Sequence, residues 1–194
     1  MQFSEPQLQA TSEFVELVVT RIGKNRVVDS VTAIACTARL AGSLLFRSFN
    51  FKSQDWSPGT VVLSPEADQE TPRLVVLLAT ALHHSNITLD KGKLTRERDW
   101  IGPQPSLSFL ESLALLQDDA FEILGKHSLR LPEAAEAATL ATTFMIKTSP
   151  ATLDPEGGFK LAVNGFLDGS KRVPPPLRSA LPSTRPPKPW FKFW

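Results

Sequence analysis

One stretch of small and apolar residues, 27–50, constrains the fold of this chain more than any other. Apolar or small side chains recur in it at spacings of three and four residues, the period of one face of an α-helix. That face consists of Val31, Ile34, Ala35, Ala38, Ala41, Gly42 and Leu45. Because small side chains let a neighbouring helix come close, we predict a central helix with other helices packed against it. Asp29 is a candidate N-cap for this helix.

Four more segments have helical periodicity and capping signals. The first spans 4–23 and the fourth spans about 105–125, each with a serine-based capping box at its start. A third helix begins either at Ser64 or at Thr71, because a proline follows each of these residues. The fifth spans 132–148, and its alanine stripe is a candidate partner for the central helix.

Residues 158–168 have a different period. Phe159, Leu161 and Val163 alternate with other residues, and Asn164-Gly165 follows, which is a strong hairpin signal. We therefore predict a small β hairpin there, with 60–63 as a candidate third strand. The predicted fold is mainly α: an irregular bundle of about five helices with this hairpin (residues 1–168), followed by an extended Pro-rich arm (residues 169–194).

The charge is divided unevenly between these two segments. All 20 acidic residues lie at or before Asp168, together with 15 of the 21 basic residues, so this part carries a net charge of −5. The arm carries six basic and no acidic residues, and seven of the 16 prolines. This proline density excludes helix and central strand and favours extended, polyproline-like chain. Such a charge asymmetry is typical of an interaction tail.

Four aromatic residues cluster near the end of the sequence, interspersed with lysines. The candidate partner-binding residues are Lys188, Trp190, Phe191, Lys192, Phe193 and Trp194. Exposed together, these aromatics would form a larger apolar patch than soluble monomers usually carry, so we expect them to be covered. The arm can dock on its own domain or on a protein partner. A membrane surface and single-stranded nucleic acid are further alternatives, which the acidic body disfavours.

The sequence offers little for catalysis. It contains no nucleophile elbow, phosphate-binding loop or zinc-binding motif, and its single cysteine, Cys36, lies in the apolar stripe of the central helix. We predict no cofactor and no metal. The alternative that stays open is a small hydrolase or metal-dependent enzyme using His83 or His84 with Asp118 or Asp119, and such a zinc site would also need His127.

We therefore predict a non-enzymatic interaction or accessory protein whose basic aromatic arm docks on its own domain or on a protein partner. The first residues lack the apolar core of a secretory signal, and the longest apolar run, 74–82, is too short to span a bilayer. We expect a soluble, cytoplasmic protein. The sequence places no constraint on its oligomeric state.

Overall fold

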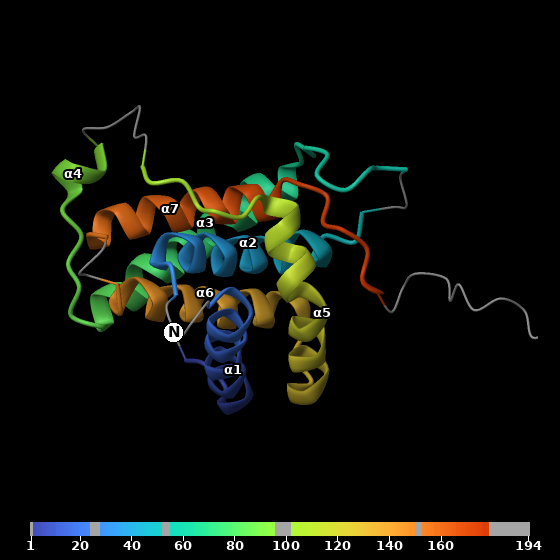
Figure 1. Cartoon of the computed structure of the whole chain (residues 1–194), viewed down its shortest axis with the longest axis horizontal. Coiled ribbons are helices and arrows are strands. Elements are labelled where there is room, and N and C mark those ends of the chain that lie inside the picture. The colour runs from blue at the N-terminus through green and yellow to red at the C-terminus, as the bar shows by residue number, and fades with distance from the viewer. Residues whose placement is uncertain (1, 24–27, 52–54, 96–101, 150–152, 179–194) are drawn as a thin grey trace, which may run out of the picture.

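A computed structural model describes residues 2–23, 28–51, 55–95, 102–149 and 153–178. These residues form seven α-helices and no β-strand, so the predicted mainly α class is confirmed (Figure 1). The helices are α1 (Glu5–Ile22), α2 (Ser30–Ser48), α3 (Pro65–His84), α4 (Lys91–Thr95), α5 (Phe109–His127), α6 (Leu131–Lys147) and α7 (Pro155–Ser170). None of the helices in the described part of the chain has the length and apolar character needed to cross a membrane.

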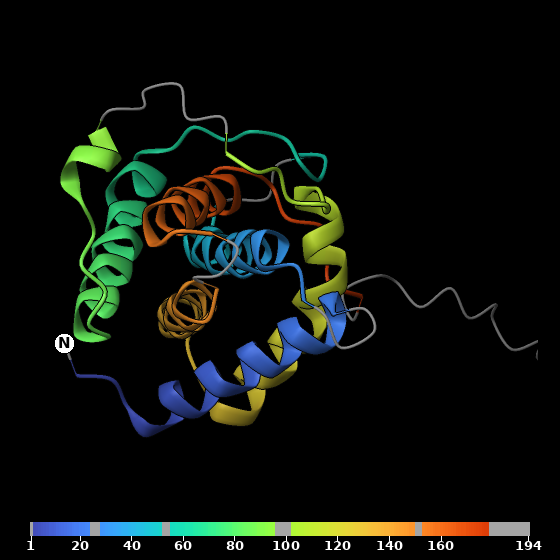
Figure 2. The same cartoon turned by 60° about the vertical axis from the view of Figure 1, so that its left-hand side comes forward.

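Helix α2 lies at the centre of the bundle, as predicted. Figure 2 shows it surrounded by α1, α3, α5, α6 and α7. Every residue from Thr32 to Phe46 is buried, and the Asp29 side chain caps the helix by accepting from the backbone N–H groups of Val31 and Thr32. Helix α6, which carries the alanine stripe, packs against α2. Small residues on both helices allow this close contact.

The predicted hairpin at 158–168 is wrong, because these residues belong to α7. Asp154 caps α7 by accepting from the Gly157 N–H, and Pro155 occupies its first turn. The Asn164-Gly165 pair lies inside the helix and makes no turn. A Cβ atom on Gly165 would lie 2.6 Å from the Cβ of Ala38 on α2. Glycine is needed here for close helix packing, which a sequence pattern does not distinguish from the need for a tight turn.

Two more glycines bring α7 and α2 into backbone contact. A Cβ atom on Gly42 would lie 2.8 Å from the Cα of Gly169, and one on Gly169 would lie 2.7 Å from the Cα of Gly42. Real Cβ atoms essentially never come that close to another heavy atom. The two helices therefore meet through small residues along their length, and α7 takes the place of the predicted β element in the core.

Three other regions refine or correct the prediction. Helix α3 begins after the N-cap Ser64, the first of the two predicted starts, and continues through Pro72. Residues 91–95 form the short helix α4, where no helix was predicted. The candidate strand 60–63 makes one isolated antiparallel bridge, between Val61 and Arg172. The described chain thus has seven helices where about five were predicted.

Candidate functional site

The chain that leaves α7 runs back along the loop before α3. The Val62 N–H donates to the Lys171 carbonyl (2.8 Å), and the Val173 N–H donates to the Thr60 carbonyl (2.9 Å). The Gly59 N–H in turn donates to the Val173 carbonyl (2.7 Å). These bonds extend the single Val61–Arg172 bridge and fix the direction in which the Pro-rich segment starts. We call residues 171–178, the described residues beyond α7, the arm base.

The next part of the arm base is bound through its carbonyl groups. The Arg47 guanidinium donates to the Pro175 carbonyl (2.6 Å), and the Gln117 amide donates to the Pro176 carbonyl (3.1 Å). Arg47 also donates to the Gln117 side-chain oxygen (2.9 Å), so the two side chains form one unit. Since proline has no N–H, its carbonyl is the only backbone group that can be recognised in this way. One side chain from α2 and one from α5 therefore bind two consecutive prolines.

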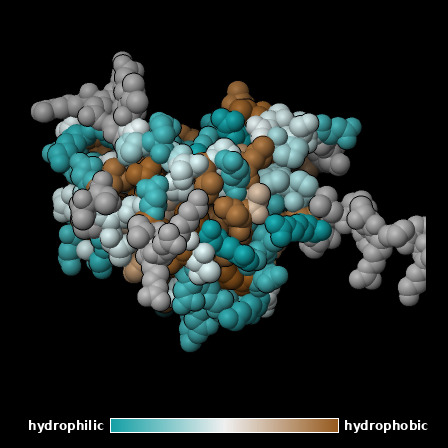
Figure 3. Space-filling model, viewed as in Figure 1, coloured by the Kyte–Doolittle hydropathy of each residue, from teal (hydrophilic) through white to brown (hydrophobic). Residues whose placement is uncertain are grey.

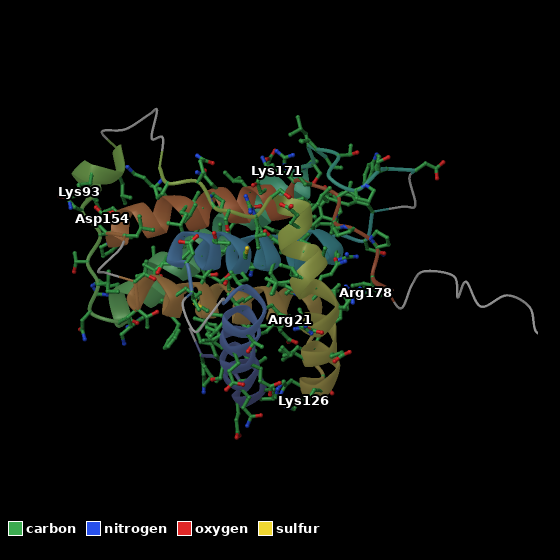
Figure 4. All side chains as sticks on the ribbon, viewed as in Figure 1. Arg21, Lys93, Lys126, Asp154, Lys171 and Arg178 are labelled. Atoms are coloured by element: carbon green, nitrogen blue, oxygen red, sulfur yellow. The ribbon has the colours of Figure 1, made fainter. Side chains whose placement is uncertain are left out.

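A charged contact follows at the end of the arm base. The Arg178 backbone N–H donates to Asp118 (3.0 Å), and its guanidinium Nε lies 3.2 Å from the other oxygen of the same carboxylate. Figure 4 shows Arg178 beside α5, at the end of the described chain, with Arg21 and Lys126 on the side of α5 that faces α1. The Arg178 side chain is 80% exposed. We therefore expect this ion pair to orient the end of the arm base and to add little to the stability of the fold.

A groove of about 410 Å³ opens beside the arm base. Its domain side is built from the aromatic residues Phe46, Phe51, Trp56 and Phe121. Three residues of the arm base, Val173, Pro174 and Leu177, also line the groove. Its volume lies within the range of about 300–1,000 Å³ that is typical of ligand sites. The arm base is therefore part of the groove wall.

The exit from α2 gives the groove its aromatic side. Asn50 adopts a left-handed backbone conformation (φ 50°), which turns the chain after the helix. The rings of Phe46 and Phe51 then lie 5.1 Å apart, and Phe51 meets Trp56 edge to face at 5.7 Å. Phe46 is buried, whereas Phe51 is partly exposed and lines the groove.

Arg47 gives the groove an unusual charge. Burial lowers the pKa of its guanidinium, and the nearby Asp118 carboxylate partly opposes this shift. Its hydrogen bonds go to the neutral oxygens of Gln117 and Pro175, its Nε has no hydrogen-bond partner, and its cation lies 5.5 Å from the centre of the Phe121 ring. A poorly hydrated cation of this kind interacts well with the faces of aromatic rings.

The six predicted partner-binding residues lie outside the described residues. Their role in docking therefore stays a prediction, and only the arm base that leads to them is placed. The sequence reasoning missed Arg47 and Gln117. An arginine within the apolar run of the central helix was the available signal for Arg47, whereas no local pattern marks Gln117.

The residues of the alternative enzyme reading are distributed over several contacts. Asp118 pairs with Arg178 of the arm base, whereas Asp119 accepts a hydrogen bond from Arg21 Nε on α1 (2.7 Å). His127 lies 2.8 Å from a Glu13 oxygen. His83 and His84 are exposed at the end of α3, away from α5 in Figure 1.

The structure thus does not bring these histidines to the two aspartates. Among the described residues, no three His, Cys, Asp or Glu side chains are arranged to hold a metal ion. The ion pairs of the two aspartates account for their positions on α5.

The rest of the described surface has no site as well defined as the groove beside the arm base. Figure 3 shows hydrophobic areas scattered among hydrophilic ones on the face it presents. A second groove, of about 340 Å³, lies between α3 and α7, and aliphatic residues such as Val75, Val76 and Leu167 line it. Scattered exposed apolar residues are normal for a folded protein.

Comparison with known proteins gives no relative: no family model matches the chain, and no significant match was found among curated proteins or solved structures.

Proposed function

We propose that this chain is a non-enzymatic interaction protein whose helical domain holds a basic, Pro-rich arm for docking, on its own surface or on a protein partner. The observation that carries the proposal is the recognition of two consecutive proline carbonyls by Arg47 and Gln117. Binding extended Pro-rich chain through its carbonyls, beside aromatic side chains, is an established mode of peptide recognition. The domain already applies it to its own arm base.

The charge distribution supports the same proposal. The arm has six basic and no acidic residues, whereas the chain up to Asp168 carries a net charge of −5. The Arg178–Asp118 contact joins the two. Opposite charges of this kind guide a segment to its binding surface and increase the rate of association. The negative charge of the chain up to Asp168 also disfavours binding of the whole protein to an anionic membrane or to nucleic acid.

The experiment compares the full-length chain with a tail variant in which Trp190, Phe191, Phe193 and Trp194 are replaced by alanine. A control variant replaces Leu8 and Val76, two exposed apolar residues of the domain, by alanine. If the arm docks on its own domain, the tail variant should lose about 4–8 °C of Tm for a contact of about 2 kcal/mol, because about 2–4 °C corresponds to 1 kcal/mol at this chain length. The control should change far less.

Two other results are informative. An unchanged Tm together with the loss of a specific co-purifying protein would place the docking site on a partner, which the proposal includes. An unchanged Tm, unchanged co-purifying proteins and flotation with anionic phosphatidylserine vesicles that requires the four aromatics would overturn it in favour of membrane binding.

A further inference from the structure

We infer, resting on the proposed function, that residues 188–194 of this same chain fold back into the aromatic groove beside the arm base. The groove is lined by aromatic rings, by a partly desolvated cation and by three residues of the arm base. Each of these features matches a property of residues 188–194. The inference names the occupant of the groove, where the proposed function leaves open which surface the arm binds.

The first argument is the place where the described chain ends. Leu177 lines the groove, and Arg178 next to it is the last described residue. Eleven residues separate Arg178 from Trp190. Even fully extended chain of that length spans at most about 36–40 Å, so the aromatics begin within reach of the groove. Closing a loop this short has a small entropic cost, and tethering gives the segment an effective concentration in the millimolar range.

The second argument is the match of side chains. The groove wall consists of Phe46, Phe51, Trp56 and Phe121, and rings that are already present meet edge to face there. Aromatic rings added to such a wall gain both apolar burial and favourable ring–ring geometry. The Arg47 guanidinium, which lines the groove beside the Phe121 ring, favours an aromatic occupant over an aliphatic one, since tryptophan binds cations best among the ring systems.

The third argument is charge. Asp118 and Glu122 lie one turn apart on α5, on either side of Phe121 in the sequence. Asp118 already receives Arg178, the first basic residue of the arm beyond its proline run. Lys188 and Lys192, which flank the tail aromatics, can meet the same acidic edge when the rings enter the groove.

The groove between α3 and α7 is the natural comparison. Its wall is aliphatic, with Val75, Val76 and Leu167, and the Asp68–Lys171 ion pair borders it (2.6 Å). It has no aromatic ring in its lining and no cation without an ion-pair partner. Variants of this second groove therefore serve as a matched control.

The first test uses a fluorescein-labelled peptide with the sequence of residues 186–194. It should bind the full-length tail variant, whose groove is empty, and bind the wild-type chain at least about tenfold more weakly, because the tethered segment competes. Phe121→Ala in the tail variant should weaken peptide binding at least about tenfold, since buried aromatic residues dominate such contacts. Leu167→Ala, in the α3–α7 groove, should leave binding unchanged. If Phe121→Ala lowers the Tm, Trp56→Ala on the loop before α3 replaces it.

The second test separates folding back from exchange between copies. Equal amounts of ¹⁵N-labelled and unlabelled wild-type chains are treated with a carbodiimide, which joins lysine amines to carboxylates in contact. We expect cross-links from Lys188 or Lys192 to Asp118, Asp119 or Glu122 within single chains. Cross-links between labelled and unlabelled chains would overturn the inference in favour of a second copy.

Equal peptide binding by the wild-type chain and the tail variant would also overturn it, as would binding that the Phe121 and Trp56 variants leave unchanged. Either result would leave the proposed function standing, because that proposal depends on the Tm and flotation of the tail variant and not on this groove.

Discussion

Two neighbours of α2 contact it in opposite ways. Helix α7 meets α2 through Gly42, Gly165 and Gly169, at distances that leave no space for a side chain. Helix α5 also contributes apolar residues to the core, but it is joined to α2 by side-chain hydrogen bonds as well. Arg39 donates to the Ser112 hydroxyl (3.1 Å), and Arg47 donates to the Gln117 amide oxygen (2.9 Å).

The α2–α7 contact fixes the fold, whereas groups in the α2–α5 contact can change their partners. Backbone packed against backbone has one geometry, since the interior is close-packed and a single added methyl group must displace a helix. The Arg47–Gln117 bond is only partly buried, and polar groups in such a place can exchange a protein partner for water or for another chain at a small net change in free energy. We therefore expect the α2–α7 contact to be structural and the α5 side to be the place where binding is regulated.

The largest effect should come from Gly42→Ala. Its Cβ would lie 2.8 Å from both the Gly169 Cα and the Ser170 nitrogen, and these are backbone atoms that cannot rotate away. We expect a loss of about 3 kcal/mol of unfolding free energy, at the upper end of overpacking effects, measured by urea denaturation. Gly125→Ala on α5 is the control, because nothing lies within 4 Å of its Cβ position. That change should stabilise by up to about 1 kcal/mol, as alanine does in a helix.

A Gly42→Ala protein as stable as the wild type would contradict the comparison directly. It would mean that α7 can move away from α2 without loss, and the glycines would then have no special place in the fold.

The sequence predicted helix α2 better than helix α7. Small residues at helical spacing, with Asp29 as the cap, led to the correct central helix, because the helical period and the N-cap are local properties of the chain. The hairpin error at Gly165 has a physical cause. A glycine is required equally by a tight turn and by a close helix crossing, and only the position of Ala38, 127 residues earlier, decides between them.

The candidate site was predicted even less completely. The charge and proline content of the arm are compositional, so the sequence indicated an interaction segment. The attachment of the arm base depends on Arg47 and Gln117, which are 70 residues apart and meet only in the folded chain. Arg47 had one local signal, its place in the apolar run of the central helix, whereas Gln117 had none, because a glutamine on a helix usually lies at the surface and this one is buried.

A smaller effect on stability, but a specific one, is expected for Arg47→Met. Replacing a buried cation by an apolar side chain of similar length can be neutral for overall stability, so we expect a change within about 1 kcal/mol. The arm base should nevertheless detach, because the Pro175 carbonyl loses its donor. Amide hydrogen exchange at Arg178, whose N–H donates to Asp118, should become at least about tenfold faster by NMR.

The control for this change is Arg73→Met, since Arg73 is exposed and pairs with Glu70 on its own helix. It should leave both the stability and the exchange at Arg178 unchanged. Unchanged exchange in Arg47→Met would show that the charged contact at Asp118 holds the arm base without the proline recognition.

The smallest effect is expected for the polar contact between α5 and α1, whose strength should depend on pH. Glu13 of α1 accepts a hydrogen bond from Lys126 (2.7 Å), and the same oxygen lies 2.8 Å from His127. These two contacts, with Lys126 the stronger influence, hold the pKa of Glu13 below its ordinary value of 4.5. A carboxyl whose pKa is lowered by folding stabilises the fold above its unfolded pKa and loses this contribution as the pH falls through the folded pKa.

The Glu13→Gln variant should therefore be less stable than the wild type by about 0.5 kcal/mol near pH 7, a typical value for a partly exposed ion pair. The difference should shrink below about pH 4.5 and vanish once Glu13 is protonated in the folded protein, as followed by urea denaturation over a pH series. Glu16→Gln, at an exposed position of the same helix, should show no such change. If the difference instead persists at acid pH, Glu13 acts through packing and not through charge. The contact between α1 and α5 would then depend on packing, as the α2–α7 contact does.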